Sequence, residues 1–329
     1  SHKESVPEDP LKWATDQFNI LPPLSWSEKL PSVEDQREIF RQYITEKEKI
    51  QEKFGKDAMV YESELNKLRH QKGERFFQSF ELSIRHHNAL NSGAPAFERM
   101  WHFWGNHFSL SNKDFISNWH YGPYMREAIR PSMDKTFEEM VVEVTTSWGM
   151  IHHLDNTDNI GPNSQDGRRE NSDGDKKKVG LNENHARELL ELHTVSPAAN
   201  YTQDDVINMA KVLTGWAKKW SKKNSWAGPL VFQPELHEMG QKNILGKSYN
   251  TKENKMTGNK QLFAVIKDLC NHKSCREFIA KKLCQHFITD EPSQEMIDPI
   301  VQAWVKSDGF LTEIHKATMK VAFEYGNKH

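Results

Sequence analysis

The densest group of chemically active side chains lies in residues 182–194, which read NENHARELLELHT. Each residue of an α-helix advances by about 100° around the axis, so this stretch separates into two sides. The charged side carries Glu183, Arg187 and Glu191. The other side is predicted to face the core and carries His185, Leu189, Leu192 and His193. Glu188 is expected at the border between the two sides.

A histidine among leucines needs a partner, because an unpaired buried polar group costs about 1–3 kcal/mol. His193 therefore either bonds to a carboxylate or carbonyl group in the core, or acts as a metal ligand or general base. Two further histidines stand in similarly unusual surroundings. His107 lies in the aromatic stretch MWHFWGNHF, and His237 lies in the irregular stretch FQPELHEMG. The repetition of this pattern favours one shared site.

We therefore predict a metal site with the ligands His107, Glu188, His193 and His237. Glu191 or Glu238 is expected to support these ligands or to act as the general base. Mixed histidine and glutamate ligands are typical of zinc, and iron or manganese also remain open. Because a bound metal activates water, the predicted reaction class is hydrolysis. The motifs GxSxG, GxxxxGK[ST], GxGxxG and HExxH do not occur in the sequence.

The main alternative is a binding or assembly protein. The same polar residues would then form a buried hydrogen-bond network that fixes the fold. Its partner would be another exported protein or a cell-surface polymer. Two further hypotheses are weaker. Haem binding lacks an attachment motif, and nothing in the sequence sets the distance between two carboxylates for a glycosidase.

Composition excludes some classes of protein. Lys and Arg total 44 against 46 Asp and Glu, so the net charge of −2 gives no reason to expect nucleic-acid binding. No apolar run approaches the about 20 residues that span a bilayer. Ten Trp and 17 Phe residues can build a large core. Cys270 and Cys275 are either core thiols or a disulfide pair, and Cys284 is left over.

The elements that must position these residues are mostly helices, so the predicted fold class is all-α. Residues 1–31 are rich in proline and are predicted to form an extended arm. Ser32 with Asp35 gives a helix start signal. A small hairpin is expected around residues 230–233 and 243–246. The predicted helices cover residues 32–54, 59–90, 96–108, 134–154, 182–193, 202–215, 258–269, 274–288, 294–306 and 310–325.

Residues 32–329 are predicted to form a single large helical domain. It could consist of two lobes, 32–154 and 181–329, joined by the polar loop 155–180. This loop has almost no apolar residues, and long loops in compact domains are usually functional or disordered. The loop is therefore interpreted as either a lid or a disordered insertion.

Five segments resemble signatures of the bacterial domain-of-unknown-function family 1800. Residues 104–108 (WGNHF) resemble its FWxNHF motif, and residues 182–194 resemble its NENxARELLELHT motif. Residues 201–216 are similar to YTQxDV…LTGW, and residues 276–283 (REFIAKKL) are similar to RFIAxKL. Residues 237–246 resemble HDxGxKxxLG, with Glu238 in place of the usual aspartate.

The resemblance implies a bacterial origin and frequent export. A periplasmic or secreted location is therefore expected, although the sequence is also compatible with the cytoplasm. No reaction is implied by the resemblance.

Overall fold

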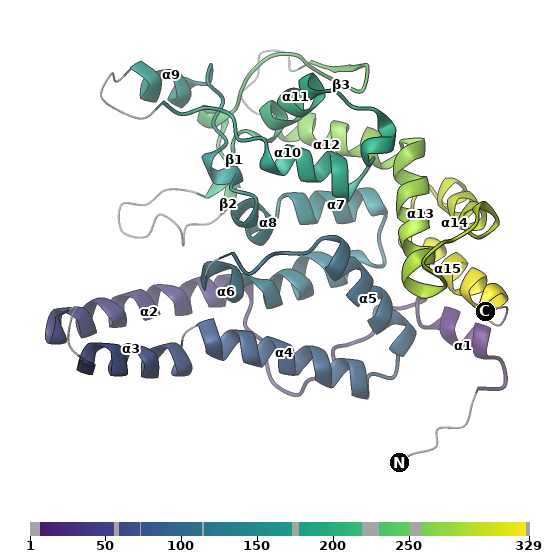
Figure 1. Cartoon of the computed structure of the whole chain (residues 1–329), viewed down its shortest axis with the longest axis horizontal. Helices are drawn as coiled ribbons and strands as arrows, with labels where there is room; N and C mark the ends of the chain where they lie inside the picture. The colour runs from purple at the N-terminus through teal and green to yellow at the C-terminus, as the bar shows by residue number, and fades with distance from the viewer. Residues whose placement is uncertain are drawn as a thin grey trace.

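The computed structural model describes residues 7–55, 59–72, 74–113, 115–172, 178–218, 230–250 and 258–326. The described residues form fifteen α-helices and two small antiparallel sheets of two strands each. The predicted all-α fold class is thus confirmed. The helices are arranged in an elongated lower layer, a middle and upper group, and a C-terminal group at one end (Figure 1).

The lower layer contains the N-terminal helices. They are α1 (Pro10–Asp16), α2 (Val33–Phe54), α3 (Met59–Gln71) and α4 (Glu74–Asn91). The capping box predicted at Ser32 and Asp35 is confirmed at the start of α2. The arm 1–31 was predicted to be wholly extended, which is wrong for α1. Asp9 caps this helix and Pro10 occupies its first turn, a start signal that the high proline content concealed.

The middle group follows α4 in the chain. It consists of α5 (Pro95–His107), α6 (Phe115–Pro123), a π-helix (Tyr124–Ile129), a 3-10 turn (Arg130–Ser132), α7 (Phe137–Thr145) and α8 (Trp148–His153). The single helix predicted over 134–154 is therefore two helices. Ser147 caps the start of α8 with its side chain and so separates it from α7. The predicted helix 59–90 is likewise divided into α3 and α4.

The upper group contains the polar segment and the small sheets. Its elements are a 3-10 turn (Asn156–Asp158), α9 (Gln165–Ser172), α10 (Asn184–Glu188), a π-helix (Leu189–His193), a 3-10 turn (Pro197–Ala199), α11 (Gln203–Leu213), β1 (Trp216–Lys218), β2 (Leu230–Phe232), a 3-10 turn (Pro234–Leu236), β3 (Lys242–Ile244) and β4 (Lys247–Tyr249). The segment 155–180 is thus not all loop, and its residues 173–177 lie outside the described residues.

The predicted hairpin is wrong in its pairing. Strand β2 pairs with β1, so that Ala217 lies opposite Val231. Strand β3 instead pairs with β4 through a tight turn, with Asn243 opposite Ser248. Leu245 and Gly246 both have positive φ in that turn, which is the geometry that a two-residue hairpin requires.

The C-terminal helices agree with the prediction to within one or two residues. They are α12 (Gly258–Cys270), α13 (Lys273–Phe287), α14 (Gln294–Lys306) and α15 (Leu311–Tyr325). Helix α1 lies against α15 near the end of the chain (Figure 1). Cys270, Cys275 and Cys284 are buried free thiols.

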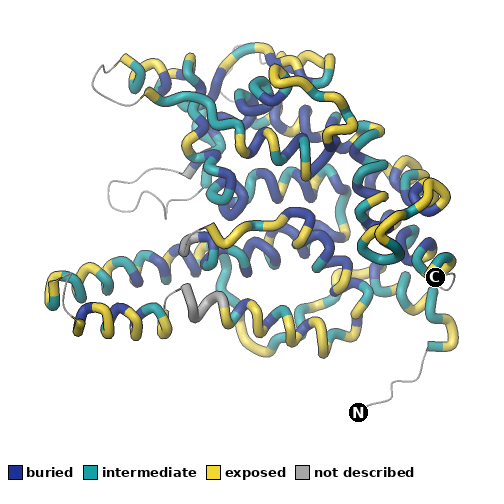
Figure 2. The backbone as a smooth tube through the Cα atoms, in the orientation of Figure 1, coloured by how far each residue is buried: buried dark blue, intermediate teal, exposed yellow. Residues whose placement is uncertain are grey.

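One large hydrophobic core joins the middle, upper and C-terminal groups, and a second, smaller cluster joins α2 and α3 to Trp119 of α6. The large core includes Trp104 of α5, Phe137 of α7, Leu189 of the π-helix and Ile279 of α13. The core therefore draws residues from both sides of the segment 155–180. Buried residues run along the facing sides of the middle and upper helices (Figure 2). No helix in the described part of the chain is long and apolar enough to cross a membrane.

Candidate functional site

Three helical segments bring His107, His193 and Lys282 together. His107 is the last residue of α5, and its Nε2 lies 3.2 Å from the backbone oxygen of His193. On its other side, Nζ of Lys282 on α13 lies 2.9 Å from His107 Nδ1. An ammonium group can only donate, so Nδ1 accepts and Nε2–H donates to the carbonyl. These two bonds fix the tautomer of His107.

Aromatic packing holds the His107 ring in this position. Phe103 stacks on it with ring centroids 6.2 Å apart, and the ring of Phe108 meets it edge-on at 4.4 Å. Burial and the charge of Lys282 hold the pKa of His107 well below its usual value. The imidazole is therefore neutral, as a hydrogen-bond acceptor facing an ammonium group must be.

His193 is positioned by the π-helix that continues α10. A π-helix has more residues per turn than an α-helix, so the side chains after Glu188 rotate away from their predicted directions. Leu192 was predicted in the core and is 47% exposed, whereas Leu190 is buried. His193 and His185 still reach the core as predicted. Such π-turns occur frequently at functional sites.

Two buried imidazoles in this region have ring nitrogens without a hydrogen-bond partner. Among the described residues, no group bonds to either nitrogen of His185 or to Nδ1 of His193. Burial lowers the pKa of both histidines to about 3, with the charges of neighbouring basic groups adding to the effect. Both are neutral near pH 7. We refer to His107, His185, His193 and Lys282 as the histidine–lysine cluster.

Glu188 and Glu191 lie on the same helical segment but have other contacts. Burial and the charge of Glu191 raise the pKa of the half-buried Glu188. Glu191 accepts a hydrogen bond of 2.9 Å from the hydroxyl of Tyr201. Of the three residues on the predicted charged side, only Glu183 and Arg187 therefore form an ion pair in the described part of the chain, with nitrogen and oxygen 2.8 Å apart. No hydrogen bond or ion pair of the described residues joins Glu188 or Glu191 to His107 or His193.

His237 and Glu238 belong to a second polar cluster. His237 Nδ1–H donates to the backbone oxygen of Thr214 over 2.8 Å. The carboxylate of Glu238 accepts from the backbone and side-chain nitrogens of Asn163, at 2.9 and 2.7 Å. Lys242 donates to the backbone oxygen of Glu238, and burial lowers the pKa of Lys242 to about 8. No described contact connects this cluster to the histidine–lysine cluster.

Of the four predicted metal ligands, the structure thus brings together His107 and His193. Within the described ranges, no three His, Cys, Asp or Glu side chains are arranged to hold a metal ion. The ammonium group of Lys282 also points at His107 Nδ1, where it would repel a divalent cation. The metal site remains a prediction that this geometry does not by itself support.

Sequence reasoning did not single out Lys282 as a functional residue. The helical spacing offers one signal, because Lys282 follows Phe278 by four residues on α13. Its ammonium group lies 5.3 Å from the centroid of the Phe278 ring, and that ring packs near His107. This spacing places Lys282 and Phe278 on the same face of α13.

The comparisons with known proteins agree with the resemblance seen in the sequence. The model of a family described as "Protein of unknown function (DUF1800)" matches residues 9–324. This chain belongs to that family. No curated protein and no solved structure matches it. In this DUF1800 protein, three of the segments that carry the resemblance (104–108, 182–194 and 276–283) supply His107, His193 and Lys282, which meet in one place.

Proposed function

We propose that this protein is an enzyme of the hydrolase class whose active site is the histidine–lysine cluster. The observation that carries the proposal is the set of unpartnered ring nitrogens on His185 and His193. A network that served only to hold the helices together would satisfy these groups, because each unsatisfied one costs about 1–3 kcal/mol. Ring nitrogens that lack a partner in the free protein can form hydrogen bonds with a bound ligand.

The chemistry follows from the charges of the cluster. With a pKa of about 3, His193 is a weak base, so its role is to donate or accept hydrogen bonds as a neutral imidazole. Lys282 is half-buried and carries the positive charge of the cluster. It is placed to stabilise a negatively charged oxygen that develops on the substrate. Glu188, whose pKa is raised, is the nearest candidate in the sequence for an acid or base.

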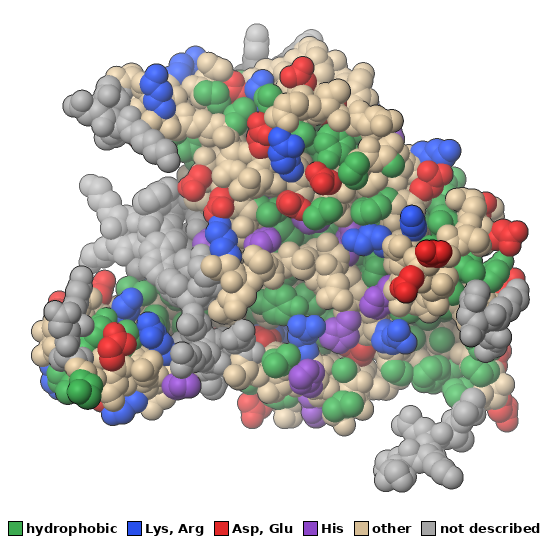
Figure 3. Space-filling model, viewed as in Figure 1, with side chains coloured by type: hydrophobic (Ala, Val, Ile, Leu, Met, Phe, Trp, Pro, Cys, Tyr) green, Lys and Arg blue, Asp and Glu red, His purple; other side chains and the backbone are tan. Residues whose placement is uncertain are grey.

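The cluster lies close to the surface on one side, because Lys282 is only half-buried, while His107 and His193 are 6% and 5% exposed. Histidine side chains, with Lys and Arg among them, gather across the middle of one face, between the upper and lower helices (Figure 3). A periplasmic or secreted location is part of the proposal and rests on the family resemblance. Fractionation of the source cells with an antibody would test the location.

Replacing Lys282 by Met is expected to reduce hydrolysis by about 100-fold, the usual loss when one donor to a transition-state oxyanion is removed. The assay is a panel of chromogenic carboxylic, phosphate and sulfate esters. Lys281→Met on the same helix is the matched control, because Lys281 is exposed and makes no described contact with the cluster. Equal activity of the Lys282→Met and Lys281→Met proteins would contradict the proposal.

Replacing His185 by Leu is expected to stabilise the protein by about 1–3 kcal/mol, because it removes two unsatisfied buried nitrogens. The free energy of unfolding is measured with urea. A structural hydrogen-bond network, as in the binding or assembly hypothesis, predicts the opposite sign. A clear loss of stability in His185→Leu would therefore favour that hypothesis over an enzyme.

A metal-dependent version of the same function is the second candidate. It is favoured by the neutral state of His185 and His193, since metals bind the deprotonated imidazole. The expected result is stoichiometric zinc or another divalent metal in tag-free protein, measured by elemental mass spectrometry. His193→Ala should lose this metal while its circular dichroism spectrum stays unchanged. Metal-free wild-type protein that is active would rule this version out.

A further inference from the structure

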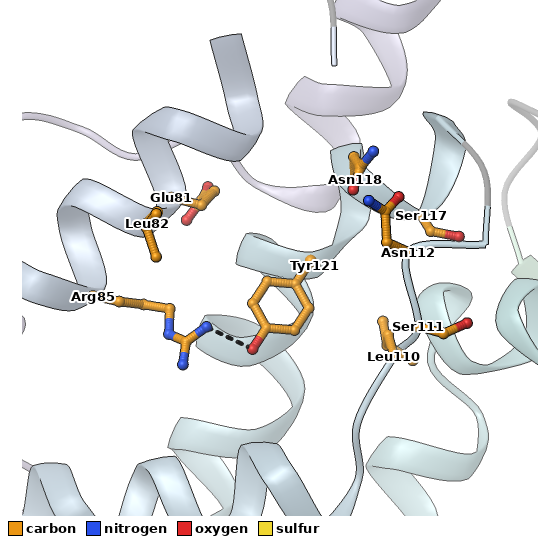
Figure 4. Close-up of a pocket in the computed structure, with 9 residues that line it drawn as sticks. All are labelled: Glu81, Leu82, Arg85, Leu110, Ser111, Asn112, Ser117, Asn118 and Tyr121. Carbon is orange, nitrogen blue, oxygen red and sulfur yellow. Dashed lines mark hydrogen bonds between the residues drawn. The ribbon is translucent and has the colours of Figure 1, made fainter. Parts of the chain in front are cut away.

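A separate cavity of about 220 Å³ lies between α4, α6 and the segment that follows α5. Figure 4 shows Glu81 and Arg85 entering it from α4, Tyr121 and Asn118 from α6, and Asn112 from the connecting segment. None of these residues belongs to the histidine–lysine cluster. Polar groups from three segments that converge on one cavity are typical of a ligand site.

Arg85 supplies a positive charge that has no carboxylate partner. Its guanidinium donates to the hydroxyl of Tyr121 over 2.9 Å and lies 5.5 Å from the centre of that ring (Figure 4). Its other terminal nitrogen lies 3.5 Å from Nδ1 of His102, and its Nε is buried and has no hydrogen-bond partner in the described part of the chain. None of the described carboxylates forms an ion pair with Arg85. A planar guanidinium with free donors is suited to a carboxylate, which it can bind through two parallel hydrogen bonds.

Glu81 supplies an acceptor that is also left open. Its side chain is only 6% exposed, and Arg126 pairs with its Oε2. Its Oε1 is buried and has no partner among the described residues. The carboxylate is packed so closely over α6 that a Cβ atom on Gly122 would overlap it. Because the charge of Glu81 is already balanced by Arg126, Oε1 is suited to accept from a neutral hydroxyl group.

The remaining polar groups extend this pattern. Asn112 and Asn118 each carry a donor and an acceptor, and Ser111 adds a hydroxyl at the wall. The cavity is smaller than the about 300–1,000 Å³ of drug-sized pockets, so its ligand is small. We propose that this cavity binds a small hydroxylated carboxylic acid, such as a sugar acid. Its carboxylate binds Arg85 and Tyr121, and its hydroxyl groups bind Glu81 and the asparagines.

One residue at the wall of the cavity contacts a histidine that acts electrostatically on His185 and His193. Ser111 Oγ lies 3.1 Å from His153 Nδ1, and the charge of His153 lowers the pKa of both His185 and His193. The binding of a sugar acid does not depend on turnover. The titration below can therefore fail while the hydrolase assay succeeds, and the reverse is also true.

The test is a calorimetric titration of the full chain with glucuronate, glucose and inorganic phosphate. We expect saturable binding of glucuronate. Glucose lacks the carboxylate and phosphate lacks the sugar hydroxyl groups, so each should bind at least about tenfold more weakly than glucuronate. Arg85→Met should weaken glucuronate binding by about tenfold or more. Arg99→Met is the matched control, because Arg99 lies over the ring of Phe287 outside the cavity.

Circular dichroism of each variant shows whether it is folded. If Arg85→Met is misfolded, Tyr121→Phe replaces it, and this change should also weaken glucuronate binding because it removes the hydroxyl group beside Arg85 and leaves the ring in place. Three results would each overturn the proposal. They are no saturable binding at millimolar glucuronate, equal binding of glucose or phosphate, and unchanged binding in the folded Arg85→Met or Tyr121→Phe protein.

Discussion

Lowering the pH from 7 to about 5 is expected to destabilise the fold by about 8 kcal/mol, which is enough to unfold a typical domain. The cause is a set of buried neutral histidines. Burial lowers the pKa to about 3 for His185, His193 and His315, and to about 4 for His237. In the unfolded chain their pKa is about 6.5.

The direction in which stability changes with pH follows from the number of protons that each state binds. Between pH 6.5 and the folded pKa values, the unfolded state binds more protons, so stability is lost as the pH falls through this window. Each of the four histidines contributes about 2 kcal/mol of this loss at pH 5, from 1.36 kcal/mol per pH unit. Above pH 6.5 their contribution to stability is complete. Unfolding by urea at several pH values between 5 and 8 measures the slope.

A single variant separates this effect from the protonation of carboxylates. His315 lies outside the histidine–lysine cluster and accepts a hydrogen bond of 2.9 Å from Trp104 Nε1. His315→Gln keeps an acceptor but does not titrate, so its loss of stability between pH 7 and 5 should be smaller by about 2 kcal/mol. His86→Gln at an exposed position should leave the loss unchanged. A wild-type protein equally stable at both pH values would refute the account.

Helices with local start signals could be predicted from the sequence. The capping boxes at Ser32 and Thr202 are both formed, and they begin α2 and α11. These signals act over three residues, so no tertiary information is needed to recognise them. Helix α6 was missed because its residues, FISNWHYGP, have no clear apolar periodicity and contain both Gly and Pro. Its position depends on packing against α4 and α8.

The candidate site was only partly predictable for the same reason. Residue types alone identified His107 and His193, since buried imidazoles among apolar residues are unusual. The π-turn that directs His193 has no signature in local propensity, and it changed the side to which Leu192 points. The distance between His237 and His193 depends on how distant segments pack. Spacing along the chain therefore could not show that His237 bonds to Thr214 in another cluster.

Replacing Glu98 by Gln is expected to destabilise the protein by about 3–5 kcal/mol, because it leaves a buried arginine without its carboxylate. Arg130 donates to both carboxylate oxygens of Glu98, at 2.9 and 3.1 Å, and to the backbone oxygen of Pro22. Both side chains of the pair are at most 4% exposed. The pair joins α5, which carries His107, to the N-terminal arm. Urea unfolding at pH 8 measures the change without protonating histidines.

An exposed pair gives the control for that prediction. Glu38 and Arg41 are 2.7 Å apart on α2, but their side chains are 51% and 37% exposed. Glu38→Gln should therefore cost no more than about 0.5 kcal/mol. The double variant Glu98→Met with Arg130→Met should be less destabilised than Glu98→Gln, because it leaves no unpaired charge in the core. If Glu98→Gln costs no more than Glu38→Gln, the buried pair does not hold α5 in place, and the position of His107 depends on its aromatic neighbours and on its bonds to His193 and Lys282.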